Sequence, residues 1–218
     1  MSLRMRNHVI KWNGAAAFAL IAAFTLIGCS EKNQKVKIGD ALVDMSDMAG
    51  DRRSFKAASD RWHASNRSSS DSETMAALAT IESVAKKNFR KPLNLVGSHY
   101  ATMALNAPMG SNESKVNYTW SRASFIRAAM LGDHYSMCTL SVSYANDGDI
   151  KEFESAVWAF VALEFGTGDD VNLGGLVAHA LGRLTLEMKD AARRRADSLI
   201  TEIRKNKATY EQLVGTDF

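Results

Sequence analysis

The stretch FIRAAMLGDHYSMCTLSVSY, residues 125–144, decides the fold of this chain, because a helical pattern continues through a glycine in its middle. Glycine is favoured just after the C-terminus of a helix, since it enters the left-handed region without a Cβ penalty. Gly132 is therefore predicted to end one helix, over about residues 121–131, and Asp133 to begin the next. The stretch is interpreted as two helices that form an αα-hairpin, rather than as one helix.

The residues around this glycine change in size in steps of four. A pair of alanines before it lets a second helix approach closely, and a serine after it is expected to meet that pair across the turn. A leucine and a tyrosine then fill the widening gap between the helix axes, and a further glycine follows. The series consists of Ala128, Ala129, Gly132, Ser136, Leu140, Tyr144 and Gly148.

A similar series recurs along the chain. Trp158, Ala162 and Gly166 repeat Ser124, Ala128 and Gly132 at an offset of 34 residues. Two weaker copies lie upstream, one at Gly50, Ser54, Ala58 and Trp62, the other at Val84–Ala85, Asn88, Pro92, Val96 and Tyr100. Alanine-rich helices also produce such matches by chance, but a 34-residue period of paired helices is typical of tetratricopeptide-like repeats.

The composition predicts an all-α fold. Only two prolines occur, Pro92 and Pro108, and alanine, leucine, methionine and charged residues dominate the chain. No stretch shows sustained strand-like alternation of apolar residues. We expect antiparallel helical hairpins stacked as a short α-solenoid over residues 37–206, followed by a C-terminal tail over residues 207–218.

The best copy of the pattern resembles the Sel-1-like repeat family, a tetratricopeptide-like family. The resemblance rests on Phe125 together with the series from Ala128 to Gly148, and it is strongest over residues 120–166. The next copy departs after Gly166, because TGDDVNLGG pushes the following helix out of register. The resemblance implies stacked hairpins and a role as an adaptor in protein complexes.

The N-terminus has the pattern of an exported protein. Arg4, Arg6 and Lys11 precede an apolar run from Gly14 to Ile27, as in a secretory signal peptide. This run would span only about 21 Å as a helix, which is short for the roughly 30 Å core of a bilayer. Residues 1–28 are therefore predicted to be a signal peptide rather than a permanent membrane helix.

The sequence at the end of this run resembles the lipobox of bacterial lipoproteins. Leu26-Ile27-Gly28-Cys29 places small residues before a cysteine, so cleavage is expected between Gly28 and Cys29, with acyl chains on Cys29. Residues 29–36 would form the lipidated end and a polar tether. Ser30, rather than aspartate, follows the cysteine, which by the same resemblance favours the periplasmic face of the outer membrane in a Gram-negative bacterium. An ordinary signal peptide that contains a cysteine is the alternative.

Charge gives no reason to expect a nucleic-acid partner. The full chain has 27 Lys and Arg against 24 Asp and Glu. Three of the basic residues and no acidic residue precede Cys29, so the mature chain would be neutral. A neutral domain offers no electrostatic case for binding nucleic acid.

Residues with possible chemistry are few. Cys138 is the only cysteine of the expected mature domain apart from Cys29, and it is interpreted as a core residue. His134 lies one turn before it and could share a metal, but a structural zinc site needs four ligands and no nearby Cys/His pair completes the set. No phosphate-binding loop, nucleophile elbow or HExxH motif is present. We therefore predict no catalytic residues, metal, cofactor or small-molecule substrate.

The pattern favours a binding protein over an enzyme. The leading hypothesis is a lipid-anchored adaptor or scaffold that binds a protein partner in an envelope complex of the secretion, pilus or motor type. The alternative is a lipoprotein inhibitor or immunity factor for a periplasmic enzyme. A third class, an enzyme with a helical core, has no residue to support it.

Overall fold

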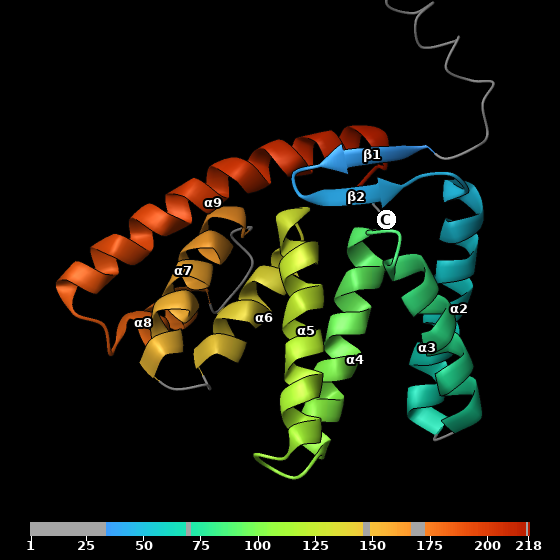
Figure 1. Cartoon of the computed structure of the whole chain (residues 1–218), viewed down its shortest axis with the longest axis horizontal. Coiled ribbons are helices and arrows are strands. Elements are labelled where there is room, and N and C mark those ends of the chain that lie inside the picture. Colours follow the sequence, from blue (N-terminus) through green and yellow to red (C-terminus); the bar gives the residue numbers. More distant parts are fainter. Residues whose placement is uncertain (1–33, 69–70, 146–148, 167–172, 217) are drawn as a thin grey trace, which may run out of the picture. The chain divides into compact units, whose positions relative to one another are not determined.

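A computed structural model describes residues 34–68, 71–145, 149–166, 173–216 and 218. The chain divides into Met1–Gln34 and a compact unit, Lys35–Phe218. Within the described part, this unit consists of a short β-hairpin followed by helices (Figure 1), so the predicted helical fold is confirmed at this level. No described helix combines the length and apolar character needed to cross a membrane.

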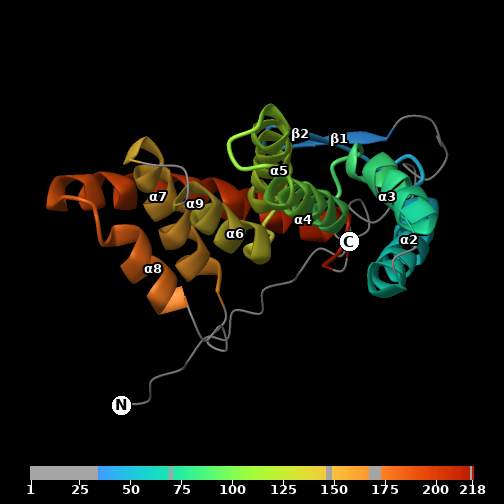
Figure 2. The ribbon, with the colours of Figure 1, turned by 90° about the horizontal axis from the view of Figure 1, so that it is seen from below.

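Helices that are consecutive in the chain pack against one another, and they follow one another in chain order in both views (Figures 1 and 2). The last helix instead runs past several others and contacts α7, α5 and β1. The helices are α2 (Met48–Ser68), α3 (Asp71–Ala85), α4 (Arg90–Asn106), α5 (Asn112–Met130), α6 (His134–Ala145), α7 (Asp149–Phe165), α8 (Leu173–Leu181) and α9 (Leu186–Leu213).

The β-hairpin corrects the predicted tether. Strands β1 (Lys35–Ile38) and β2 (Ala41–Asp44) pair antiparallel, with Lys35 opposite Asp44 and Ile38 opposite Ala41. Ile38 and Val43 are buried, so this segment is part of the folded unit and the unit begins before residue 37. Each strand has only four residues, which is too short for alternation to stand out in the sequence.

The two-helix interpretation of the stretch around Gly132 is correct. Gly132 has φ +91°, and its amide donates to the carbonyl of Ala129 at 2.8 Å. The amide of Asp133 reaches back to the carbonyl of Ala128 at 3.1 Å. These two bonds form a Schellman motif, the usual way in which glycine ends a helix. Asp133 then caps α6, because its carboxylate accepts the amide of Ser136 at 2.9 Å.

The small residues beside this turn are buried. Ala128, Ala129, Ser136 and Leu140 are fully buried, while Tyr144 is half-buried. The two alanines face different parts of the core. Ala128 packs with the cluster that contains Ile38 and Phe89, and Ala129 packs with the cluster that contains Met137, Leu140 and Trp158. The end of α5 therefore lies between two hydrophobic clusters.

The closest helix contacts involve further small residues. On α4, Gly97 has no room for a side chain, since an added Cβ would lie 2.9 Å from the ring of Phe125. Its carbonyl accepts the hydroxyl of Ser121 at 2.9 Å. Between α6 and α7, Ser141 and Ser155 each donate a hydroxyl to the carbonyl of the other, at 2.9 and 2.8 Å. Small residues thus let α5 approach α4 closely, and α6 approach α7.

The other predicted copies have mixed outcomes. Trp158 and Ala162 are buried on α7, which ends just before Gly166, whose amide donates to Ala162. Asn88 has φ +64° between α3 and α4, as expected of a residue that replaces glycine at this position. Gly148 lies outside the described residues.

The copy at Gly50 is wrong as a hairpin. Gly50 lies in the first turn of α2, where its amide donates to the Asp47 carboxylate at 3.1 Å. Positions 50–62 therefore belong to one helix, and a β-hairpin precedes it.

The predicted C-terminal tail is also wrong. Helix α9 continues to Leu213, and Tyr210, Val214 and Phe218 are buried. The Phe218 ring lies 4.3 Å from the Phe89 ring and 5.7 Å from the Phe55 ring, centroid to centroid. The final residues thus complete the cluster formed by the N-terminal half of the unit.

Substitution of Gly132 tests the turn. An alanine there would hold φ +91°, and its Cβ would lie 2.7 Å from Cγ of Lys207 on α9. Gly132→Ala should lower the free energy of unfolding by about 2–4 kcal/mol, from left-handed strain plus overpacking, in urea titrations followed by circular dichroism. Gly110→Ala is the matched control, because Gly110 has φ +75° but open space around it. If both variants lose the same stability, the contact with Lys207 is not tight.

Candidate functional site

A groove with a volume of about 280 Å³ lies where α3, α4 and α5 meet, and we call it the α3–α5 groove. Its floor is apolar, since Leu93 is 1% exposed and Val96 is 7% exposed. Side chains at helical spacing on α4 and on α5 point to it, which places each set on one stripe of its helix. The lining residues are Glu82, Ala85, Lys86, Leu93, Val96, Tyr100, Trp120, Ser124 and Arg127.

One end of this groove is aromatic. The rings of Tyr100 and Trp120 lie 6.4 Å apart, and Trp120 is 58% exposed. The Tyr100 hydroxyl donates to the Glu82 carboxylate at 2.9 Å. Burial, with this bond and the nearby negative charge, raises the pKa of Tyr100, so its hydroxyl stays protonated and keeps donating. The carboxylate of Glu82 is thereby held at the aromatic end.

The other end of the groove is cationic. The Arg127 guanidinium donates to the side-chain oxygen of Asn88, the left-handed residue between α3 and α4. The side-chain amide of Asn88 in turn donates to the carbonyl of Leu42 at 2.9 Å. Within the described part of the chain, neither Arg127 nor Lys86 forms an ion pair with an acidic residue. Two positive charges therefore border this end with no acidic side chain of the described residues paired to them.

A second groove, of about 560 Å³, lies between α2 and α4, and we call it the α2–α4 groove. Its acidic side chains are already engaged: Asp60 pairs with Lys56 at 2.9 Å, and Asp133 accepts from Ser136 and Asn94. Its floor includes Phe218, over which the Arg52 guanidinium lies at 5.5 Å from the ring centre. The contact between Arg52 and Phe218 helps to hold the last residue of the unit in place.

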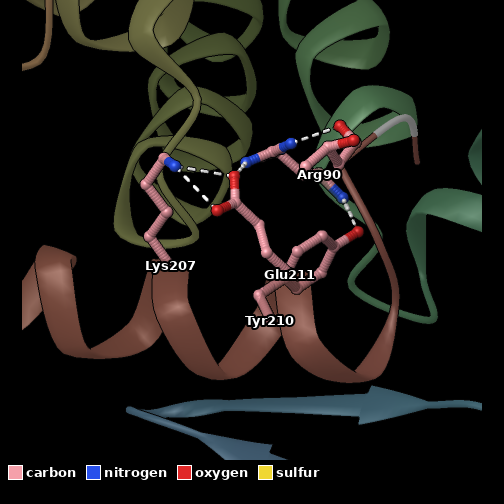
Figure 3. Close-up of polar contacts among 5 residues, drawn as sticks. Arg90, Lys207, Tyr210 and Glu211 are labelled. Carbon is pink, nitrogen blue, oxygen red and sulfur yellow. Dashed lines mark hydrogen bonds and ion pairs between the residues drawn. The ribbon is translucent and has the colours of Figure 1, made fainter.

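A polar cluster joins the end of α9 to the start of α4 (Figure 3). The amide of Arg90 donates to the Tyr210 hydroxyl at 3.0 Å, and its guanidinium donates to the carbonyl of Thr216 at 2.6 Å. Glu211 lies 3.4 Å from Arg90 and 2.7 Å from Lys207. Burial raises the pKa of Tyr210 to about 12. Burial would also raise the pKa of Glu211, but Lys207 and Arg90 lower it below its usual value.

Perturbed pKa values often mark active sites, but this cluster is structural. Tyr210 is fully buried, so no substrate reaches its hydroxyl. The hydroxyl instead accepts the first amide of α4, which has no partner within its own helix. The cluster therefore fastens α9 to α4.

His134 and Cys138 also make contacts within the fold. The Nε2 atom of His134 lies 3.1 Å from the carbonyl oxygen of Ala162 on α7 and 3.5 Å from the Cys138 sulfur. The described residues contain no group of three His, Cys, Asp or Glu side chains placed to hold a metal. His134 thus connects α6 with α7.

The predicted site residues and the α3–α5 groove do not coincide. Gly28 and Cys29 lie outside the described residues, and none of the series from Ala128 to Gly166 lines the groove, although four positions of the other copies do, namely Ala85, Val96, Tyr100 and Ser124. Sequence reasoning missed Glu82, Lys86, Trp120 and Arg127, and it identified Tyr100 only as a repeat position. The available signal was a tryptophan among polar residues in the segment NESKVNYTWSR.

The polar cluster makes the folded protein less stable at alkaline pH. Because the folded pKa of Tyr210 is about 12 and an unfolded tyrosine titrates near 10, folding favours the protonated form. The contribution of Tyr210 to the free energy of unfolding is complete below pH 10, and about 2–3 kcal/mol of it is lost as the pH rises from 10 to 12.

Tyr210→Phe isolates this effect. At pH 8 it should lower the free energy of unfolding by about 1–3 kcal/mol, because the buried amide of Arg90 loses its acceptor. The difference in the free energy of unfolding between this variant and the wild type should become smaller above pH 10 in urea titrations. A difference that stays constant from pH 8 to pH 11.5 would contradict the raised pKa of Tyr210.

Comparisons with known proteins identify no relative. No family model, curated protein or solved structure matches the chain. The Sel-1-like resemblance therefore stays a prediction from the sequence.

Proposed function

We propose that this protein is a lipid-anchored adaptor that binds another protein of the cell envelope through the α3–α5 groove. The observation that carries the proposal is the presence of Trp120, Tyr100 and Arg127 in one groove. Tryptophan, tyrosine and arginine are the residues that contribute most to protein–protein interfaces. They lie on helices whose apolar stripes are buried, so the groove is largely preformed.

The exposure of Trp120 favours a partner that covers it. A large aromatic side chain that is 58% exposed keeps apolar surface in water, and burying that surface contributes about 25 cal/mol per Å². Val116, one turn earlier on α5, is 53% exposed and extends the apolar stripe. Single exposed apolar residues are common on proteins, but here the stripe runs into a groove with an apolar floor.

The helical architecture supports the same role. Turns with a left-handed residue, at Asn88 and at Gly132, separate successive helices. Helical-repeat proteins have the same alternation of helices and turns, and their stacked hairpins form extended binding surfaces. We propose that the unit is a short α-solenoid with degenerate repeats, as the resemblance implies. The irregular spacing would make its groove particular to one partner.

The proposed location follows from the sequence. The lipobox-like Leu26–Cys29 would place acyl chains on Cys29, and Ser30 favours the outer membrane. The neutral charge of the mature chain suits a protein partner better than nucleic acid. An envelope complex of the secretion, pilus or motor type is the partner that we propose.

Cross-linking from the groove tests the function. A photo-reactive amino acid in place of Trp120 should give a defined cross-linked product with one envelope protein in the native host, detected by affinity purification and mass spectrometry. Met109, which is fully exposed and lines neither groove, is the matched control site.

Substitutions provide the second arm of this test. Trp120→Ala should reduce recovery of the partner by at least about tenfold, as expected for a hot-spot residue, while Met109→Ala leaves it unchanged. Equal recovery with both variants would contradict the proposal. A one-to-one complex with a single periplasmic enzyme would instead support the inhibitor alternative.

The anchor can be tested separately. Cys29→Ala removes the thiol that would carry the lipid, so the protein should move from the membrane to the soluble fraction of the cell. Ser30→Ala is a matched control that keeps the thiol and should stay with the membrane. Unchanged fractionation of Cys29→Ala, measured by immunoblotting, would reject lipidation at this residue.

A further inference from the structure

We infer that the α3–α5 groove accepts an extended peptide segment that carries an acidic side chain and an aromatic side chain three residues apart. This inference rests on the proposed function and specifies the chemistry of the partner. It follows from the order of charges along the groove, from the groove's length and from its volume.

Hydrogen bonds and ring contacts define the two ends of the groove. Tyr100 lies beside Trp120 and donates to Glu82, which places these three side chains at one end. Arg127 lies two turns further along α5 and binds Asn88, close to Lys86. Leu93 and Val96 lie on the floor between the ends.

The charges select both the type and the direction of the ligand. At the cationic end, Lys86 and Arg127 lack acidic partners among the described residues, so a ligand carboxylate there gains charge-assisted hydrogen bonds. At the aromatic end, the Glu82 carboxylate repels an acidic group, while the neighbouring rings of Tyr100 and Trp120 favour an aromatic ring. The acidic side chain therefore lies near Arg127 and the ring near Trp120.

The length of the groove sets the spacing of the two side chains. Trp120 and Arg127 are seven residues apart on a helix, which corresponds to about 10 Å. In a polyproline II segment, residues i and i+3 point the same way and lie about 9 Å apart. In a β-strand, side chains on one face lie about 7 or 13 Å apart, so neither spacing matches. A spacing of three residues in a polyproline II conformation fits.

The volume favours side chains of a peptide over a small molecule. The groove measures about 280 Å³, just under the roughly 300–1,000 Å³ of small-molecule sites. It is bordered by the exposed side chains of Lys86, Trp120 and Arg127, so a longer chain can continue past either end. A peptide can insert two side chains and leave its backbone outside.

The test uses defined peptides and the full lipidated protein in detergent micelles. Binding of fluorescein-labelled Gly-Asp-Pro-Pro-Phe-Gly is measured by fluorescence anisotropy. Three control peptides each change one feature: lysine replaces the aspartate, alanine replaces the phenylalanine, or one proline is removed to shorten the spacing. The prolines favour the polyproline II conformation in all four peptides.

We expect the first peptide to bind about tenfold more tightly than each control, because each control loses one favourable contact. Lys86→Glu should abolish or reverse the preference for the aspartate peptide over the lysine peptide. The control variant is Lys115→Glu, which should leave this preference unchanged because Lys115 is exposed and lies outside the groove. Both substituted lysines are exposed, so neither variant is expected to disturb the core.

Two results would overturn the inference. One is equal binding of the aspartate and lysine peptides to the wild type. The other is that no peptide binds measurably although Trp120→Ala still abolishes capture of the partner. In that case the inference about the peptide is wrong, but the proposed function still holds. Failure of the proposed function is distinct, since partner capture would then be insensitive to Trp120.

Discussion

The end of α5 is the constraint on which the rest of the unit depends. Its two adjacent alanines face different hydrophobic clusters, and the next turn must reverse direction without adding bulk. Glycine at φ +91° satisfies both demands, because it adopts the left-handed conformation and leaves room for the aliphatic stem of Lys207. Helix α9 can therefore pack across the turn, and in doing so it contacts both clusters through Ile203 and Tyr210.

The same packing positions the groove. Ala128 and Leu131 anchor one face of α5 in the first cluster, while Phe125 fills the space left by Gly97 on α4. Once these contacts fix the rotation of α5, Trp120 and Arg127 point along the boundary between α3 and α5. The position of the groove thus depends on buried residues that do not line it, among them Gly97, Phe125 and Ala128.

Local rules explain what could be predicted from the sequence. The turn at Gly132 and its cap at Asp133 depend on neighbouring residues alone, so they could be inferred correctly. The prediction at Gly50 was wrong because glycine also occurs in the first turn of a helix. Here the Asp47 carboxylate caps that helix by accepting the amide of Gly50. The end of α9 was missed because the buried stripe includes a polar residue, Asn206, which interrupts the apolar pattern before Tyr210.

The groove could not be predicted in this way, because its charges matter only through tertiary neighbours. In the sequence, Lys86 and Arg127 resemble ordinary charged residues on helix surfaces, and Glu82 offers no sign of its bond to Tyr100. Three helices must pack before these side chains share a surface. The polar cluster could not be predicted from the sequence for the same reason, since Arg90 and Tyr210 lie far apart in the chain.

The burial of Phe218 has a consequence for the order of folding. The first hydrophobic cluster draws on Ile38, Phe55 and Phe89 but also on Tyr210, Val214 and Phe218. Contacts between residues so distant in sequence form late, because the entropy of closing a long loop opposes them. Until its last residues are available, the chain therefore has this cluster incomplete. The N-terminal half of the unit can then reach its final packing only when the C-terminal residues join it.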